Sequence, residues 1–75
     1  MPAVPVLRPR EVIGNLETLG FAEVRQRGSH KRFRHSDGCT TTVLVHPGRD
    51  LSPILLRQIT RDVGLTAHDF VAYRR

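Results

Sequence analysis

The chain is poor in cysteine and in aromatic residues. Its 75 residues include one cysteine, three phenylalanines, one tyrosine and no tryptophan. The single Cys39 excludes an internal disulfide framework and is typical of proteins of the reducing cytoplasm, where we expect this protein to be located. The phenylalanines fall where a small core needs them, so base stacking on aromatic side chains is not favoured as a way of binding nucleic acid.

Long apolar runs are also absent. No segment approaches the roughly 20 apolar residues that span a bilayer, so we expect no membrane partner. The first seven residues contain two prolines and do not resemble a signal peptide. We expect residues 1–7 to form a flexible N-terminal tail and residues 8–75 to form a single domain. Its core must be thin, which excludes an enzyme built around a deep cofactor pocket, and we expect no cofactor.

Acidic residues are few compared with basic ones. Seven Asp and Glu oppose twelve Lys and Arg, which gives a formal net charge of +5, and all the cations except Lys31 are arginines. A guanidinium group pairs two donors with one phosphate. No acidic residue interrupts a cluster made of Arg25, Arg27, Lys31, Arg32 and Arg34. This cluster favours an anionic partner, nucleic acid first, and the alternative is a solvated basic face.

Apolar periodicity and turn residues predict the order of elements. A helix over 10–19 follows Pro9, places Val12, Ile13, Leu16 and Leu19 on one stripe and ends at Gly20. Strands over 21–27, 30–35 and 40–45 then form an antiparallel meander with turns at 28–29 and 36–38. A second helix begins at Ser52-Pro53 and ends at Gly64, and a short last helix follows Thr66 through Phe70 and Tyr73.

Two helices can cover only one face of a three-stranded sheet, so the other face must stay open. Phe33 is the only large apolar residue of the second strand and should point toward the helices. Side chains alternate along a strand, so His30, Arg32 and Arg34 should share the open face. A bulge near Gly28 would break this parity for His30.

A basic sheet face with one histidine could cleave RNA. The ribose 2′-hydroxyl is an internal nucleophile, and the protein must supply a base, positive charge for the transition state and an acid for the leaving group. His30 would act as the general acid or base, with Lys31 and Arg32 holding the phosphate. DNA lacks this nucleophile, so the site would select RNA. The alternative is a histidine on the surface of a basic strand.

Other polar residues have less defined roles. His46 could approach His30 across the sheet or brace the loop before the second helix. Arg57 and Arg61 share one helix face, which is either solvated or a second contact to an anionic partner. The histidines and Cys39 have no recognised metal-ligand spacing, so we expect no metal, and Cys39 is interpreted as a hairpin residue.

Several motifs carry a family resemblance. They comprise Gly20-Phe21, the segment Val24 to His30, Phe33, His35, Asp37-Gly38, Thr42-Val43, Val45 to Gly48, Leu56-Arg57, Ile59, Arg61 and Gly64-Leu65. With the Gly-Ser-His-x-x-Phe core and the later Val-His-x-Gly, the chain resembles the HicA (YcfA-like) toxin family over residues 9 to 73.

The resemblance implies an α+β, double-stranded-RNA-binding-domain-like fold, in which a helix, a three-stranded antiparallel sheet and a second helix are followed here by a short C-terminal helix. It also implies a toxin that cleaves mRNA without a metal, is paired with a HicB antitoxin, and carries its catalytic histidine at His30. The RNA-contacting residues would be Arg25, Arg27, Ser29, Lys31, Arg32, Arg34, Arg57 and Arg61.

Two alternatives belong to other functional classes. A non-catalytic RNA-binding module could use the same basic face to recognise RNA shape. An interaction protein could present that face to an acidic protein and bind no nucleic acid. Cleavage and RNA-binding assays distinguish these two from a nuclease.

Overall fold

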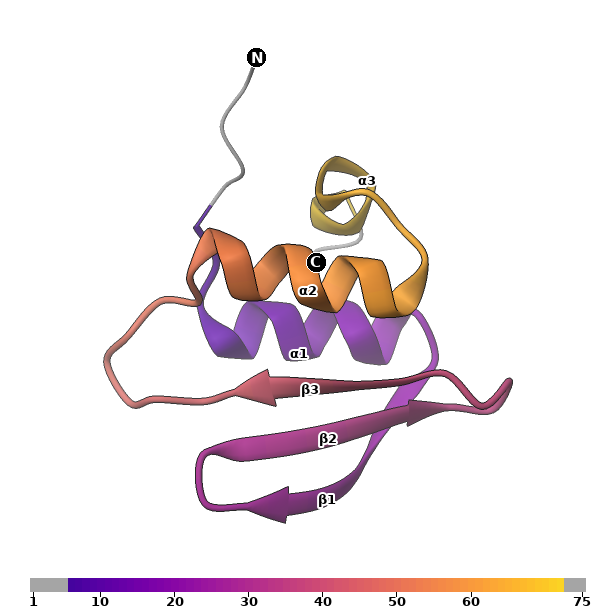
Figure 1. Cartoon of the computed structure of the whole chain (residues 1–75), viewed down its shortest axis with the longest axis horizontal. Helices are drawn as coiled ribbons and strands as arrows, with labels where there is room; N and C mark the ends of the chain where they lie inside the picture. The colour runs from indigo at the N-terminus through magenta and orange to yellow at the C-terminus, as the bar shows by residue number, and fades with distance from the viewer. Residues whose placement is uncertain (1–5, 73–75) are drawn as a thin grey trace.

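A computed structural model of the protein, which describes residues 6–72, has an α+β architecture (Figure 1). Its elements are α1 (Pro9–Thr18), β1 (Phe21–Arg27), β2 (His30–His35), β3 (Thr40–Leu44), α2 (Pro53–Val63) and α3 (Ala67–Val71). The predicted order is confirmed, and the first helix and third strand differ from expectation by one residue at their ends. Tyr73, to which the sequence extends the last helix, lies outside the described residues.

The three strands form one antiparallel sheet in the order β1-β2-β3, and α1 and α2 lie together on one of its sides (Figure 1). No helix of the described part of the chain lies on the opposite side. This arrangement is the double-stranded-RNA-binding-domain-like layout that the family resemblance implies. Within residues 6–72, no helix is long and apolar enough to cross a membrane.

The core lies between the sheet and the helices. Its buried apolar residues are Leu7, Val12, Leu16, Phe21, Phe33, Val43, Leu51, Leu56, Ile59 and Phe70. Phe33 is fully buried at the middle of the central strand and therefore points toward the helices, as its parity predicts. Leu7, which the sequence assigns to the tail, is buried in the core, and its carbonyl accepts a 2.7 Å hydrogen bond from the Leu51 N–H that fixes this segment beside Leu51.

Polar side chains position the helix ends and the last helix. Ser52 accepts a hydrogen bond from the Leu55 N–H and caps α2, and Gly64 ends that helix with φ 79°, a left-handed conformation that favours glycine. Asn15 is buried in α1, and its amide Nδ2 donates to the Phe70 carbonyl at 3.1 Å. This bond ties the short α3 to the first helix.

Strand pairing is irregular within β1 and not near Gly28, where a bulge would have changed the parity of His30. Glu23 pairs with Phe33, while the next residue of β1 in register is Arg25, which pairs with Arg32. Val24 is therefore the extra residue of a β-bulge. The extra residue shifts the alternation of side chains by one position. Arg25 and Arg27 therefore lie on the face of the sheet opposite Phe33.

Candidate nucleic-acid interface

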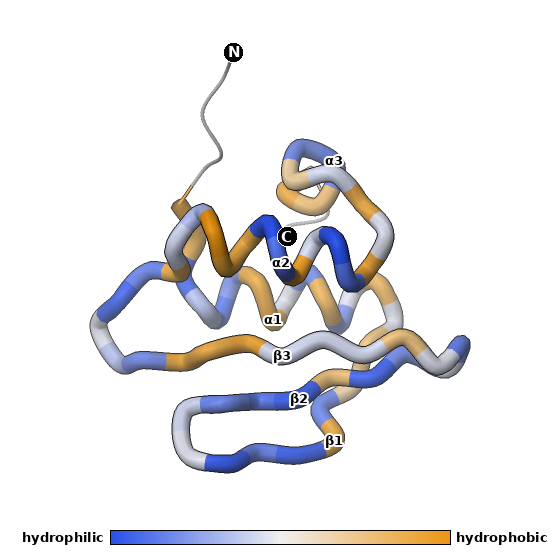
Figure 2. Tube along the Cα trace, in the orientation of Figure 1, coloured by the Kyte–Doolittle hydropathy of each residue, from blue (hydrophilic) through white to orange (hydrophobic). Residues whose placement is uncertain are grey.

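The uncovered face of the sheet is basic. Cross-strand partners share a face, so the register places on this open face the exposed side chains of Arg25, Arg27, His30, Arg32 and Arg34. Figure 2 shows the hydrophilic character of most of β1 and β2. The bulge at Val24 is what unites the two strands' arginines, since an unbroken alternation from Phe21 would put Arg25 and Arg27 on the helix side.

His30 stands at the beginning of β2, directly after the turn formed by Gly28 and Ser29. Gly28 has φ 58°, which a two-residue hairpin turn requires and glycine adopts without strain. His30 pairs with Arg27 on one side and Leu44 on the other. Directly opposed side chains have Cβ atoms about 4.5–5.5 Å apart, so the exposed imidazole lies beside a guanidinium group.

Arg32 is oriented by a side-chain contact. Its Nη2 donates to the Thr40 hydroxyl oxygen at 3.1 Å, which holds the guanidinium on the open face. Its direct partner on β1 is Arg25. Two like charges at opposed positions repel each other, and an anion between them would relieve that repulsion. The sequence did not indicate Thr40 as a positioning residue, because only the β2–β3 register brings it near Arg32.

The remaining predicted RNA contacts do not share this surface. Lys31 lies on the helix side of the sheet, where its Nζ is 3.6 Å from Glu23 Oε1, so the sheet separates it from His30 and Arg32. Arg57 and Arg61 are exposed on α2, the layer that covers the opposite face. Ser29 is half-buried, and its carbonyl accepts the Val45 N–H at 2.7 Å.

A family comparison identifies the protein's class. A family model described as the HicA toxin of bacterial toxin-antitoxin matches residues 9–65. The chain belongs to the HicA toxin family. The match begins at the first residue of α1 and ends just beyond α2, so it includes every residue of the basic open face. HicA toxins are parts of toxin–antitoxin systems, so the family implies an antitoxin partner. No curated protein matches the chain.

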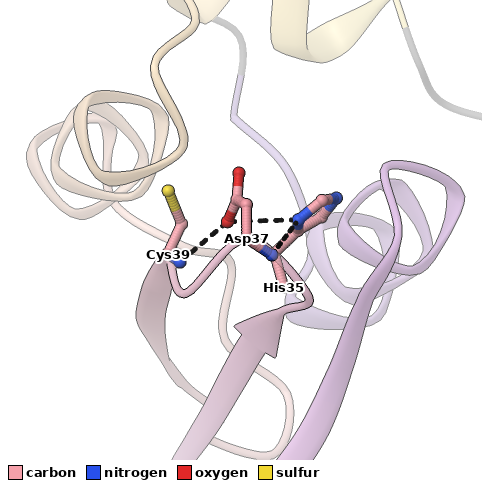
Figure 3. Close-up of polar contacts among 3 residues, drawn as sticks. All are labelled: His35, Asp37 and Cys39. Carbon is pink, nitrogen blue, oxygen red and sulfur yellow. Dashed lines mark hydrogen bonds and ion pairs between the residues drawn. The ribbon is translucent and has the colours of Figure 1, made fainter.

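In this HicA-family protein, a polar cluster closes the β2–β3 hairpin (Figure 3). The His35 Nδ1 accepts the Asp37 N–H at 3.1 Å, and Asp37 Oδ1 accepts the Cys39 N–H at 2.8 Å. The Cys39 backbone N–H is the main cause that lowers the pKa of Asp37.

The Asp37 carboxylate in turn raises the pKa of the exposed Cys39 thiol by accepting its hydrogen bond. A raised pKa keeps the thiol protonated at neutral pH and makes it a poor nucleophile. The geometry thus agrees with a hairpin role for Cys39. Among residues 6–72, no three His, Cys, Asp or Glu side chains lie close enough together to hold a metal ion.

His46 does not lie on the sheet. It is exposed in the loop after β3 and lines an open cleft of about 510 Å³, together with Arg8, Pro9, Arg10, Val45, Pro47, Gly48, Arg49 and Asp50. The Leu7–Leu51 backbone pairing brings the two halves of the cleft together. No spacing in the sequence could have predicted this cleft, because its two segments are separated by the entire sheet.

Proposed function

We propose that this HicA-family protein is an endoribonuclease that cleaves mRNA and is inhibited by a HicB-type antitoxin. The observation that carries the proposal is the exposed His30 imidazole on an uncovered sheet face, between Arg27 on the neighbouring strand and Arg32 on its own. A histidine can exchange protons near neutral pH, and guanidinium groups bind and neutralise phosphate.

The proposed reaction uses the RNA's own nucleophile. His30 takes the proton of the ribose 2′-hydroxyl, and the 2′-oxygen forms a bond to the adjacent phosphorus. The bond from phosphorus to the 5′-oxygen of the next nucleotide breaks, and that oxygen leaves as a hydroxyl after receiving a proton from solvent water. The products are a 2′,3′-cyclic phosphate and a new 5′-hydroxyl end. Arg25, Arg27, Arg32 and Arg34 stabilise the negative charge that develops on the phosphate oxygens.

Because the nucleophile belongs to the substrate, the reaction does not require an activated water. We therefore expect cleavage to continue at full rate in excess EDTA. An RNA carrying a 2′-deoxy sugar at the cleaved position should resist cleavage while binding normally. Cleavage of that deoxy substrate would contradict the proposed nucleophile.

His30→Ala is the direct test of the mechanism. Loss of a positioned acid–base group should slow RNA cleavage by about 100- to 10,000-fold. Equilibrium RNA binding should change little, because the arginines remain. His68→Ala is the matched control, since His68 is an exposed histidine of α3 outside the open face. It should cleave RNA at the wild-type rate.

Two results would overturn the assignment. Equal cleavage by wild type and His30→Ala would remove His30 from catalysis. Tight binding of RNA that stays intact with both proteins would identify a non-catalytic RNA-binding module. The toxin role is tested in bacteria: induced wild-type protein should arrest growth, His30→Ala should not, and co-expressed HicB-type antitoxin should restore growth.

A further inference from the structure

The cleft beside the sheet presents a second concentration of guanidinium groups. Arg8 and Arg10 line it from the beginning of α1, and Arg49 lines it from the loop that leads to α2. All three are exposed, and none forms an ion pair with an acidic side chain within residues 6–72. Among the described residues, Asp50 is the only carboxylate that lines the cleft, so this lining carries a net positive charge.

The cleft lies at the same end of the molecule as His30. The turn before His30, the loop after β3 and the beginnings of α1 and α2 all gather at this end (Figure 1). Leu44 pairs with His30, and the Val45 N–H bonds to the Ser29 carbonyl. His46, the first exposed cleft residue after β3, follows Leu44 by two residues, about 7 Å of extended chain.

The composition of the lining favours a phosphate ligand over an apolar one. Guanidinium groups bind phosphate oxygens with two parallel hydrogen bonds, and three arginines line the cleft from segments about 40 residues apart in sequence. Glu11 is the nearest acidic residue of α1, but its carboxylate already accepts the Arg8 backbone N–H at 3.1 Å. Since none of the three arginines forms an ion pair within residues 6–72, their guanidinium groups are available to a ligand.

We propose that this cleft binds a phosphate of the same RNA strand that is cleaved at His30, so that the strand passes from the open face around the end of the sheet. The inference rests on the proposed function for the identity of its ligand. The cleft would fix the register of the strand, because a phosphate held there sets which linkage reaches His30. Arg8, Arg10 and Arg49 are thus positioning residues.

The test measures RNA affinity without cleavage. Every variant is made in the His30→Ala background, and binding of a labelled single-stranded RNA is measured over a range of salt concentrations. Arg8→Gln and Arg49→Gln should each weaken binding by about fivefold to tenfold. The logarithm of the RNA association constant falls as the logarithm of the salt concentration rises. Each variant should make this slope less steep by about 0.7, as expected for the loss of one phosphate contact on a single strand.

Matched charge controls separate a local contact from a change in net charge. Asp50→Asn removes the carboxylate of the cleft and should strengthen RNA binding by about twofold to fivefold. Glu17→Gln makes the same charge change on an exposed residue that lies about two helical turns beyond Arg10 in α1. It should change RNA affinity less than about twofold. Circular dichroism confirms folding, which these exposed substitutions should not disturb.

The outcomes distinguish the cleft from the catalytic site. Unchanged affinity and salt slope in both arginine variants would overturn the cleft assignment, even if wild type cleaves RNA and His30→Ala does not. If the arginine variants bind RNA normally but lose affinity for the antitoxin, the cleft binds protein and the proposal is wrong. If wild type binds RNA through the cleft but never cleaves it, the proposed nuclease activity fails and the cleft assignment stands.

Discussion

Replacement of Phe33 by alanine gives the most direct test of the core. Phe33 is fully buried at the middle of β2, and its cross-strand partners are Glu23 and Thr41. Removal of a buried phenyl ring costs about 3–5 kcal/mol of unfolding free energy. A 75-residue domain has about 4–11 kcal/mol in total, at 0.05–0.15 kcal/mol per residue. Phe33→Ala should therefore lose a large part of the stability of the fold.

Urea unfolding followed by far-ultraviolet circular dichroism measures this loss. Phe33→Leu should cost less than about 1.5 kcal/mol, because leucine fills most of the space. Val24→Ala on the neighbouring strand is the control: Val24 is 56% exposed, so its truncation should change stability by less than about 0.5 kcal/mol. A cost below about 1 kcal/mol for Phe33→Ala would refute its central place in the core.

Three further predictions concern polar contacts and the bulge. Asn15→Ala should destabilise the protein by about 1–3 kcal/mol and speed hydrogen exchange in α3, because the buried Phe70 carbonyl loses its donor; unchanged exchange would contradict this. The pKa of Asp37 lies below its usual 3.8 in the folded protein, so its stabilisation is complete above that value and is lost as pH falls through the folded pKa. The difference in urea midpoint between wild type and Asp37→Asn should shrink on acidification, and a constant difference would exclude this linkage. Deletion of Val24 removes only the extra residue of the bulge, so the β1–β2 partners and RNA binding should stay intact. The free energy of unfolding should fall by less than about 1 kcal/mol. A shifted β1–β2 register in NMR spectra would contradict this prediction.

The chemistry of the open face could be predicted only in part. Alternation along one strand was enough to place Arg32 and Arg34 opposite Phe33, because side chains alternate with period two whatever the partner strand does. The same rule fails for Arg25 and Arg27, since a bulge changes parity and leaves no distinct mark in the sequence. Lys31 shows the opposite case: it lies between His30 and Arg32 in sequence, but alternation puts it on the helix side of the sheet.

Local interactions explain why the helices and strands could be predicted from the residue pattern. Helix starts at Pro9 and Ser52, the turn at Gly28 and the run of β-branched residues in β3 depend on contacts within a few residues, so the pattern alone specifies the elements and their order. The cations that share a surface are set by long-range pairing in the folded chain. Residues far apart along the chain are brought together by the strand register, by the bulge and by the Leu7–Leu51 pairing. No local sequence pattern specifies which of these residues pair.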